Sequence, residues 1–162
     1  MNARIEPSLD AEPDRTAAAA ARAEAASRTV YRRFVPLTTR WMDNDLYGHL
    51  NNVVYYSLFD SAVNGVLIEA GALDIARGEV IGLVVESQCS FFTPLAFPQP
   101  VEAGVRVARL GGSSVSYEVG IFAAGGAQTA ARGRFVHVYV DRASRRPVPL
   151  PARLLAVARE LQ

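Results

Sequence analysis

The hydrophobic pattern of this chain changes its period once, and that change constrains the fold more than any other feature. Between Val53 and Ala70 apolar residues recur every three or four positions, which predicts a helix with a wide apolar arc. From Ile81 onward apolar and polar residues alternate, which predicts strands. A helix with so wide an arc has to be mostly enclosed, so we expect the strands to curl around it.

Four predicted strands follow this helix, and one precedes it. The later strands cover residues 81–92, 101–108, 115–121 and 129–140. Glycine pairs separate the last three, which predicts short turns and an antiparallel meander. The first strand, Val30 to Trp41, contains Pro36 and is therefore expected at a sheet edge or a bulge. A short helix from Ala152 to Leu161 closes an α+β domain that covers residues 28–162.

Residues 1–27 differ from the rest because they are rich in alanine, arginine and acidic residues. Alanine favours a helix, but no stripe of large apolar side chains is present to dock one. We expect a flexible N-terminal extension. A transit peptide is the alternative, and the acidic residues of the segment argue against it, because transit peptides are poor in acids.

Composition limits the partners. The formal net charge is only +1, which disfavours a nucleic-acid binder that works by broad phosphate neutralisation. No apolar run approaches the roughly 18 residues that span a bilayer, so no membrane segment is expected. Cys89 is the single cysteine and cannot form an intrachain disulfide, which favours a reducing compartment, the cytoplasm.

Polar residues gather immediately before the predicted helix. The segment from Asp43 to Asn52 contains two aspartates, a glycine and a histidine, and it has little periodicity. Aspartates are common in turns and at helix starts, so Asp43 and Asp45 could be structural. They could also supply a carboxylate for catalysis next to the N-terminus of a helix. The local pattern alone leaves both interpretations open.

A longer motif contains this segment. The residues Trp41-Met42-Asp43-Asn44-Asp45-Leu46-Tyr47-Gly48-His49-Leu50-Asn51-Asn52 resemble the signature of the 4-hydroxybenzoyl-CoA thioesterase branch of the hot-dog superfamily, in which Asp-x-Asp-x-x-Gly precedes the central helix. The His-x-Asn-Asn part is similar to long-chain acyl-CoA and plant acyl-carrier-protein thioesterases. Together with the element order, the resemblance covers about residues 30–160. It implies a hot-dog fold, thioester hydrolysis, and a homodimer or homotetramer with active sites at subunit interfaces.

The resemblance assigns roles to single residues. Asp45 stands where the family places its catalytic carboxylate, and His49 follows four residues later as the second catalytic candidate. Gly48 matches the family glycine, and Tyr47 stands where the plant enzymes have Asn. We expect Tyr47, Gly48 and Asn51 to contact the substrate, although capping the helix is the more common role for Asn51. Asn51 or Asn52 suits the N-cap of this helix, and Gly71 suits its end. Asp60, inside the helix, resembles a recurrent family acid with a structural or supporting role.

The chemistry that follows is hydrolysis of an acyl-CoA thioester. A carboxylate can activate water as a general base or attack the carbonyl as a nucleophile, and the sequence does not choose between them. Backbone amides at the start of the helix can stabilise the oxyanion. Two histidines and one cysteine give no clustered spacing for a metal, and no nucleotide-binding glycine pattern is present, so no metal or cofactor is expected. Coenzyme A is the preferred carrier, with acyl carrier protein as the other possibility.

Two other classes remain open. A hot-dog hydratase or dehydratase resembles Asp-x-Asn-Pro-x-His, whereas here Asp45 and His49 are four residues apart and no proline precedes the histidine. A non-catalytic acyl-thioester-binding module is the other, and the presence of Asp45 speaks against it.

Three residues away from the motif have expected structural roles. We expect Glu86 at the surface or an interface, Cys89 as a small hydrophobe, and His137 as a core histidine with satisfied hydrogen bonds.

Overall fold

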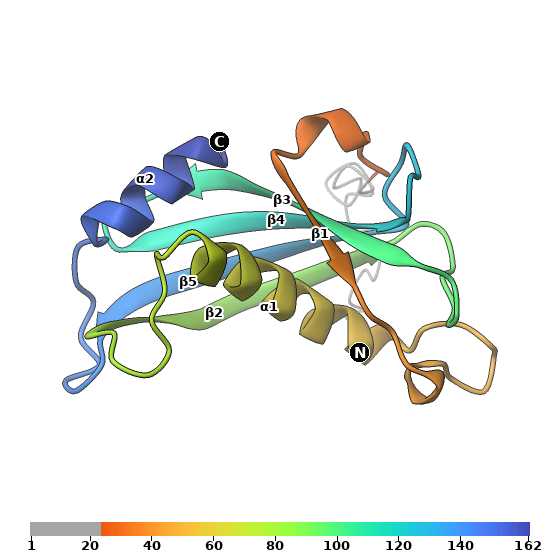
Figure 1. The fold of residues 1–162 in the computed structure, drawn as a ribbon, viewed down its shortest axis with the longest axis horizontal. Helices are drawn as coiled ribbons and strands as arrows, with labels where there is room; N and C mark the ends of the chain where they lie inside the picture. Colours follow the sequence, from red (N-terminus) through yellow and green to blue (C-terminus); the bar gives the residue numbers. More distant parts are fainter. Residues whose placement is uncertain (1–23) are drawn as a thin grey trace, which may run out of the picture.

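A computed structural model describes residues 24–162, and it shows one antiparallel sheet curled around a long helix (Figure 1). The helices are α1 (Asn52–Glu69) and α2 (Ala152–Glu160), and the strands are β1 (Arg33–Leu37), β2 (Val80–Phe91), β3 (Val101–Leu110), β4 (Ser114–Ala123) and β5 (Ala131–Asp141). The predicted α+β hot-dog architecture is confirmed. In the part of the chain that is described, no helix has the length and apolar character needed to cross a membrane.

The strand order is β1-β3-β4-β5-β2. The last three strands form the predicted meander, in which each strand pairs with the next one along the chain. The two earlier strands close the sheet at its edges, β1 beside β3 and β2 beside β5. Most of the predicted extension, residues 1–23, lies outside the described residues, but Ala26 exchanges backbone and side-chain hydrogen bonds with Thr129.

Helix α1 covers Asn52–Glu69 and so matches the predicted segment, residues 53–70, to within one residue at each end. The side chain of Asn51 accepts a hydrogen bond from the Val53 amide and caps the N-terminus. Gly71 has a φ of +65°, the left-handed conformation that commonly ends a helix. Between them Phe59 is fully buried, and its ring packs so closely on Gly133 of β5 that any side chain there would collide with it.

The first strand is shorter than predicted. Only Arg33–Leu37 pairs in the sheet, and short 3-10 turns occupy Arg28–Val30 and Trp41–Asp43 on either side. The second turn forms because the Asp43 carboxylate accepts hydrogen bonds from the backbone and side chain of Arg40. Such a local bond competes with strand pairing. Pro36 does lie at a sheet edge, as predicted.

The two edges of the sheet differ in length and protection. β1 has five residues and a proline, which limits pairing with another chain. β2 has twelve residues, and its exposed residues include Val84 and Val85, with 46% and 60% of their surface accessible. A long apolar edge of this kind is normally covered by something else.

His137 differs from its predicted role in one respect. It is buried in the core with only 2% of its surface exposed, and its ring packs against Tyr117 and Phe135. Its Nε2 atom, however, has no hydrogen-bond partner within residues 24–162, so the expectation of satisfied hydrogen bonds was wrong. Alternation along a strand predicts burial, but it carries no information on which polar atoms face across the core.

Candidate active site

The loop that connects β1 to α1 folds into a tight hairpin around Asp45. Asn44 and Leu50 form an isolated antiparallel bridge, and the Asp45 amide donates to the His49 carbonyl at 2.8 Å. The Gly48 amide returns a hydrogen bond of 3.1 Å to the Asp45 carbonyl. Gly48 has a φ of +81°, a conformation that residues with a side chain rarely adopt. The family glycine is therefore needed here for the turn itself.

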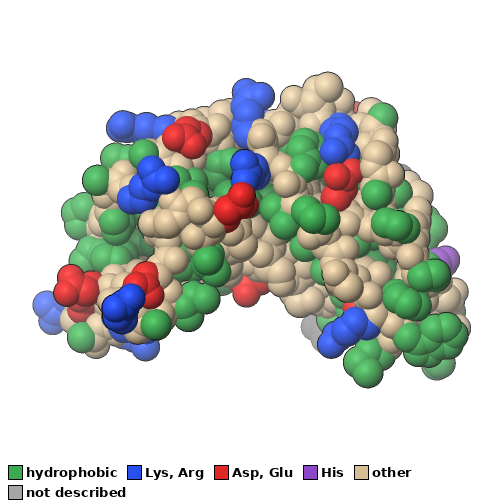
Figure 2. All heavy atoms as spheres, viewed as in Figure 1, with side chains coloured by type: hydrophobic (Ala, Val, Ile, Leu, Met, Phe, Trp, Pro, Cys, Tyr) green, Lys and Arg blue, Asp and Glu red, His purple; other side chains and the backbone are tan. Residues whose placement is uncertain are grey.

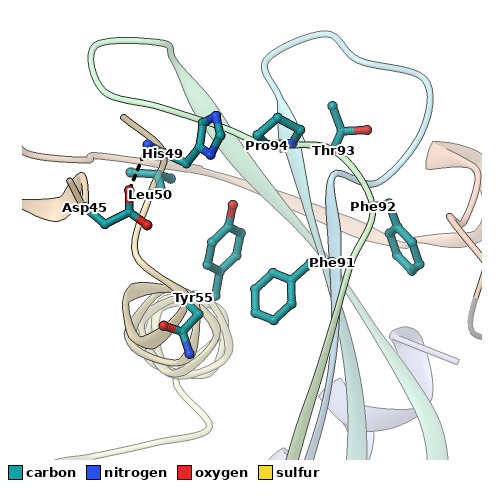
Figure 3. A pocket seen from close by; sticks show the side chains of 9 residues that line it. Asp45, His49, Leu50, Tyr55, Phe91, Phe92, Thr93 and Pro94 are labelled. Atoms are coloured by element: carbon teal, nitrogen blue, oxygen red, sulfur yellow. Dashed lines mark hydrogen bonds between the residues drawn. The ribbon is translucent and has the colours of Figure 1, made fainter. Parts of the chain in front are cut away.

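The Asp45 carboxylate is held by one of its two oxygens. Its Oδ1 accepts hydrogen bonds from the Tyr47 amide at 2.8 Å and the His49 amide at 3.3 Å. No hydrogen bond to Oδ2 occurs in the described part of the chain. Figure 3 shows the carboxylate at the rim of a cavity, with the dashed bond to the His49 amide behind it. One oxygen thus fixes the group, and the other is available for chemistry.

The cavity beside Asp45 has a volume of about 310 Å³. Its lining consists of Asp45, His49, Leu50, Asn52, Tyr55, Phe91, Phe92, Thr93 and Pro94. Tyr55 from α1 and Phe91 from β2 meet edge to face across it, with ring centroids 5.1 Å apart (Figure 3). The cavity therefore joins an aromatic wall to a carboxylate and the first turn of a helix. This combination suits an apolar group attached to a reactive carbonyl.

Asp43, two residues earlier, occupies a different environment. Only 4% of its surface is exposed, and its carboxylate receives hydrogen bonds of 2.7 Å from both the backbone and the guanidinium of Arg40. The hydrogen bonds from Arg40 lower the pKa of this carboxyl below its ordinary value. Both oxygens are used for structure. Of the two aspartates in the motif, Asp45 is the one that faces a cavity.

A second hollow lies on the other side of the same loop. It has a volume of about 690 Å³ and is lined by Trp41, Asn44, Asp45, Leu46, Tyr47, Gly48 and Asn51. Trp41, Leu46 and Tyr47 are highly exposed, at 83%, 103% and 85%. Figure 2 shows hydrophobic side chains gathered at the end of the molecule that carries this loop. Asp45 is the residue that borders both hollows.

The structure places the five predicted site residues around one loop, in two groups. Asp45 and His49 line the cavity next to α1. Tyr47, Gly48 and Asn51 line the hollow on the other side. The Asn51 side-chain oxygen caps α1, so this atom already has a structural role.

Several lining residues were not singled out from the sequence. Tyr55 was counted as part of the apolar arc of the helix, and Phe91–Pro94 as the end of a strand. Their position at the cavity depends on the end of β2 lying beside the start of α1, where Phe91 meets Tyr55. The sequence contained one weak indication of this cavity lining, the aromatic pair Phe91-Phe92 followed by Thr93-Pro94 at the end of a predicted strand.

Other candidates lie away from the cavity. Glu86 is exposed and forms an ion pair with Arg134 at 3.3 Å. Cys89 is half-buried, and burial raises the pKa of its thiol to about 12, which disfavours a reactive thiolate near neutral pH. Within residues 24–162 no three side chains of the metal-binding types are close enough together to hold an ion.

The fold and the site define a hot-dog-fold protein of the thioesterase type. Residues 39–157 match the model of the thioesterase-like superfamily, and the chain belongs to this family. No curated protein matches the chain. Family membership therefore supports thioester hydrolysis as the general reaction, without a particular substrate.

Solved structures agree. The PA5185 protein from Pseudomonas aeruginosa strain PAO1 is 56% identical, with a TM-score of 0.84, and the match covers 86% of this chain and 97% of that one. A thioesterase from Thermus thermophilus, complexed with coenzyme A and Zn, is 27% identical with a TM-score of 0.63 over 81% and 94% of the two chains. Slr0204, a 1,4-dihydroxy-2-naphthoyl-CoA thioesterase from Synechocystis, is 19% identical with a TM-score of 0.70 over 79% and 96%, and shows the shared fold alone.

Proposed function

We propose that this protein hydrolyses an acyl-CoA thioester to a free carboxylate and coenzyme A, with Asp45 as the catalytic residue. One observation carries the proposal. The free oxygen of Asp45 and the N-terminus of α1 border the same aromatic-walled cavity. A base or nucleophile and a donor for the oxyanion are the two requirements of acyl transfer.

Asp45 has two available routes. As a general base, it takes a proton from water while the water oxygen bonds to the carbonyl carbon, and the C–S bond of the tetrahedral intermediate then breaks. As a nucleophile, its oxygen attacks the carbonyl carbon, expels the thiolate and leaves an anhydride that water hydrolyses. In both routes the thiolate takes up a proton. Because the Tyr47 and His49 amides hold Oδ1, the carboxylate keeps its orientation throughout.

The amide of Asn52 is the proposed oxyanion donor. Asn52 is the first residue of α1 and lines the cavity. Its N–H has no helical acceptor, because the first amides of any helix lack one. The dipole of an eighteen-residue helix favours negative charge at this end.

The remaining predicted residues have proposed positions along the substrate. His49 lines the cavity beside Asp45 (Figure 3), and we place it close to the reacting carbonyl. Tyr47, Gly48 and Asn51 line the second hollow, which suits the arm that carries the thiol. Since Asp45 separates the two spaces, the acyl group would lie on one side and the leaving group on the other.

We further propose that two copies of the chain pair through the exposed edge of β2. A two-fold axis perpendicular to the sheet would extend it and place both α1 helices on one face. Val85→Lys should abolish the dimer, because it adds a charge at this edge, where Val85 is 60% exposed. Ile68→Lys, on a 44% exposed residue of α1, is the matched control. Light scattering of all three proteins tests this, and a monomeric wild type would refute it.

Measuring thiol release from acyl-CoA esters of short, medium, long and aromatic acyl groups tests the activity. Asp45→Asn keeps the shape of the residue but removes the charge, so kcat should fall by about 10²–10⁴-fold with little change in KM. Asp74→Asn is the matched control. Asp74 also accepts hydrogen bonds from two backbone amides, of Ala76 and Arg77, but it lies in the loop after α1.

The same assay separates the alternatives. Hydration of an enoyl thioester without thiol release would support the hydratase, and binding without any reaction would support the acyl-binding module. An Asp45→Asn protein within about tenfold of wild type would remove the carboxylate from the mechanism.

A further inference from the structure

The inner face of β2, which faces α1, is left partly uncovered by the helix. Through pairing with β5, the inner positions of β2 are Gly82, Val84, Ser87, Cys89 and Phe91, which we call the β2 strip. Val84 and Phe91 are 46% and 51% exposed. An apolar strip therefore leads away from the Asp45 cavity.

A cavity lies at each end of the β2 strip. Phe91 lines the Asp45 cavity. Gly82 lines a second one of about 360 Å³, together with Asn64, Leu73, Ile75, Ile81 and Arg142. Most of these side chains are apolar, and the guanidinium of Arg142 donates hydrogen bonds to the carbonyls of Gly78 and Ile75. An acyl chain that starts at Asp45 can follow the strip toward this second cavity.

The imidazole of His137 borders the strip. His137 pairs with Val84, and a side chain added to Gly82 would lie 3.2 Å from His137 Nδ1. The imidazole edge is therefore adjacent to the space that the missing side chain of Gly82 leaves. Its Nε2 atom is buried and has no partner within residues 24–162. Burying Nε2 without a partner costs folding free energy, and Nδ1 is the ring nitrogen next to the space at Gly82.

Two polar groups of α1 lie on the same side of the helix. Asp60 and Asn64 are one turn apart, and the Asn64 side chain donates to Asp60 Oδ1 at 3.0 Å. The Asp60 charge acts on His137 and raises its pKa, while burial, the larger effect, lowers that pKa to about 4. His137 is therefore neutral near pH 7, with one donor and one acceptor nitrogen. A neutral hydroxyl can hydrogen-bond to Nδ1, the nitrogen beside the space at Gly82, whereas a carboxylate would meet the charge of Asp60.

We propose that His137, supported by Asp60 and Asn64, binds a hydroxyl group on the acyl chain of the substrate. The inference rests on the proposed thioester hydrolysis at Asp45. Asp60 lies eight residues after Asn52, which corresponds to about 12 Å along the helix. With carbon–carbon bonds of about 1.5 Å in a zigzag chain, this distance is spanned by roughly ten carbons. The preferred substrate class is a medium-chain acyl-CoA that is hydroxylated near its far end.

The test compares decanoyl-CoA, 10-hydroxydecanoyl-CoA and the ω-carboxylated C10 thioester. In the wild type, kcat/KM for the hydroxylated substrate should exceed that for decanoyl-CoA by about tenfold, the effect of one hydrogen bond. In His137→Phe this ratio should fall to about one, because the ring is kept and its nitrogens are removed. The ratio is insensitive to general damage, which lowers both rates together.

Tyr117→Phe is the matched control. It removes a buried hydroxyl beside His137, one that already shares a 2.8 Å hydrogen bond with Tyr139, and it should preserve the ratio. A wild-type ratio of one, a ratio that survives in His137→Phe, or a preference for the ω-carboxylated substrate would each overturn the inference. Should His137→Phe fail to fold, the wild-type ratio alone decides.

A binding measurement separates this inference from the proposed reaction. The thioethers S-decyl-CoA and S-(10-hydroxydecyl)-CoA cannot be hydrolysed, and calorimetry on the wild type gives their Kd values directly. Tighter binding of the hydroxylated thioether by about tenfold supports the site even if no thioester is cleaved. Equal Kd values refute it, whatever the outcome of the thiol-release assay.

Discussion

The meander of β3, β4 and β5 differs from the loop before α1 in how far its polar groups are hydrogen-bonded within the protein. In the meander, Tyr117 and Tyr139 share a buried hydrogen bond of 2.8 Å, and Arg106 pairs with Glu118 at 3.0 Å. In the loop, Asp45 keeps one oxygen without a bond from the described residues, and the apolar side chain of Leu46 is fully exposed. The meander uses its groups for stability, whereas the loop leaves groups available for a ligand.

Each region also contains one exception, a bonded polar residue in the loop and, within residues 24–162, an unpartnered one in the meander. Asp43 belongs to the loop but is buried and bonded to Arg40. His137 belongs to the meander but has a buried nitrogen without a partner in the described chain. Substitutions at these two exceptions, at Asp45 in the loop and at Gly133 in the meander test the difference between the two regions.

The largest expected effect is on rate, at Asp45. Asp45→Asn should lower kcat by about 10²–10⁴-fold. Its melting temperature should stay close to that of the wild type, because Asn retains an oxygen that can accept the Tyr47 amide. Turnover and thermal unfolding measured on the same preparations check both parts. A loss of activity that merely followed a loss of stability would assign Asp45 to the structural group.

The next effect is a pH dependence of stability caused by His137. Burial lowers the pKa of its imidazole to about 4, below the ordinary value of about 6.5 in an unfolded chain. The unfolded state therefore takes up the proton first, and stability that is fully present above pH 6.5 is lost as the pH falls toward 4. The loss amounts to roughly 3 kcal/mol.

Urea unfolding at several pH values, in the wild type and in His137→Phe, isolates this contribution. The wild type should lose more stability than the variant between pH 6.5 and 4. If the unfolding free energies of the two proteins fell in parallel with pH, His137 would not be held neutral in the folded state.

A smaller effect is expected at Gly133, where the meander meets α1. A methyl group added there would lie 2.4 Å from a carbon of the buried Phe59 ring. Gly133→Ala should therefore lower the unfolding free energy by about 1–3 kcal/mol through overpacking. Gly65→Ala is the opposite control, because nothing lies near that helical position and alanine favours a helix. Chemical denaturation should shift the two midpoints in opposite directions.

The smallest effect is expected at Asp43. Asp43→Asn removes the charge that Arg40 binds but keeps an oxygen for the Arg40 amide, so stability should fall by about 1–2 kcal/mol. The melting temperature and kcat together test this. An inactive protein of unchanged stability would show that the catalytic carboxylate had been assigned to the wrong aspartate.

Local patterns predicted the elements well where one period dominates. The spacing of apolar residues located α1, with Asn51 at its cap and Gly71 after its end, and alternation located the meander. The first strand was predicted too long, because a side-chain bond between Asp43 and Arg40 turns the chain, and apolar alternation does not report such bonds.

The sequence by itself determined the α+β class, the enclosed helix, the meander and the position of the acidic motif before the helix, because these follow from neighbours along the chain. Only the tertiary structure decided that Asp45 faces a cavity while Asp43 is buried, that Phe91 meets Tyr55, and that His137 Nε2 lacks a partner in the described chain. The physical reason is that burial, cavities and the satisfaction of polar atoms depend on residues brought together from distant segments. No local period encodes which of them will meet.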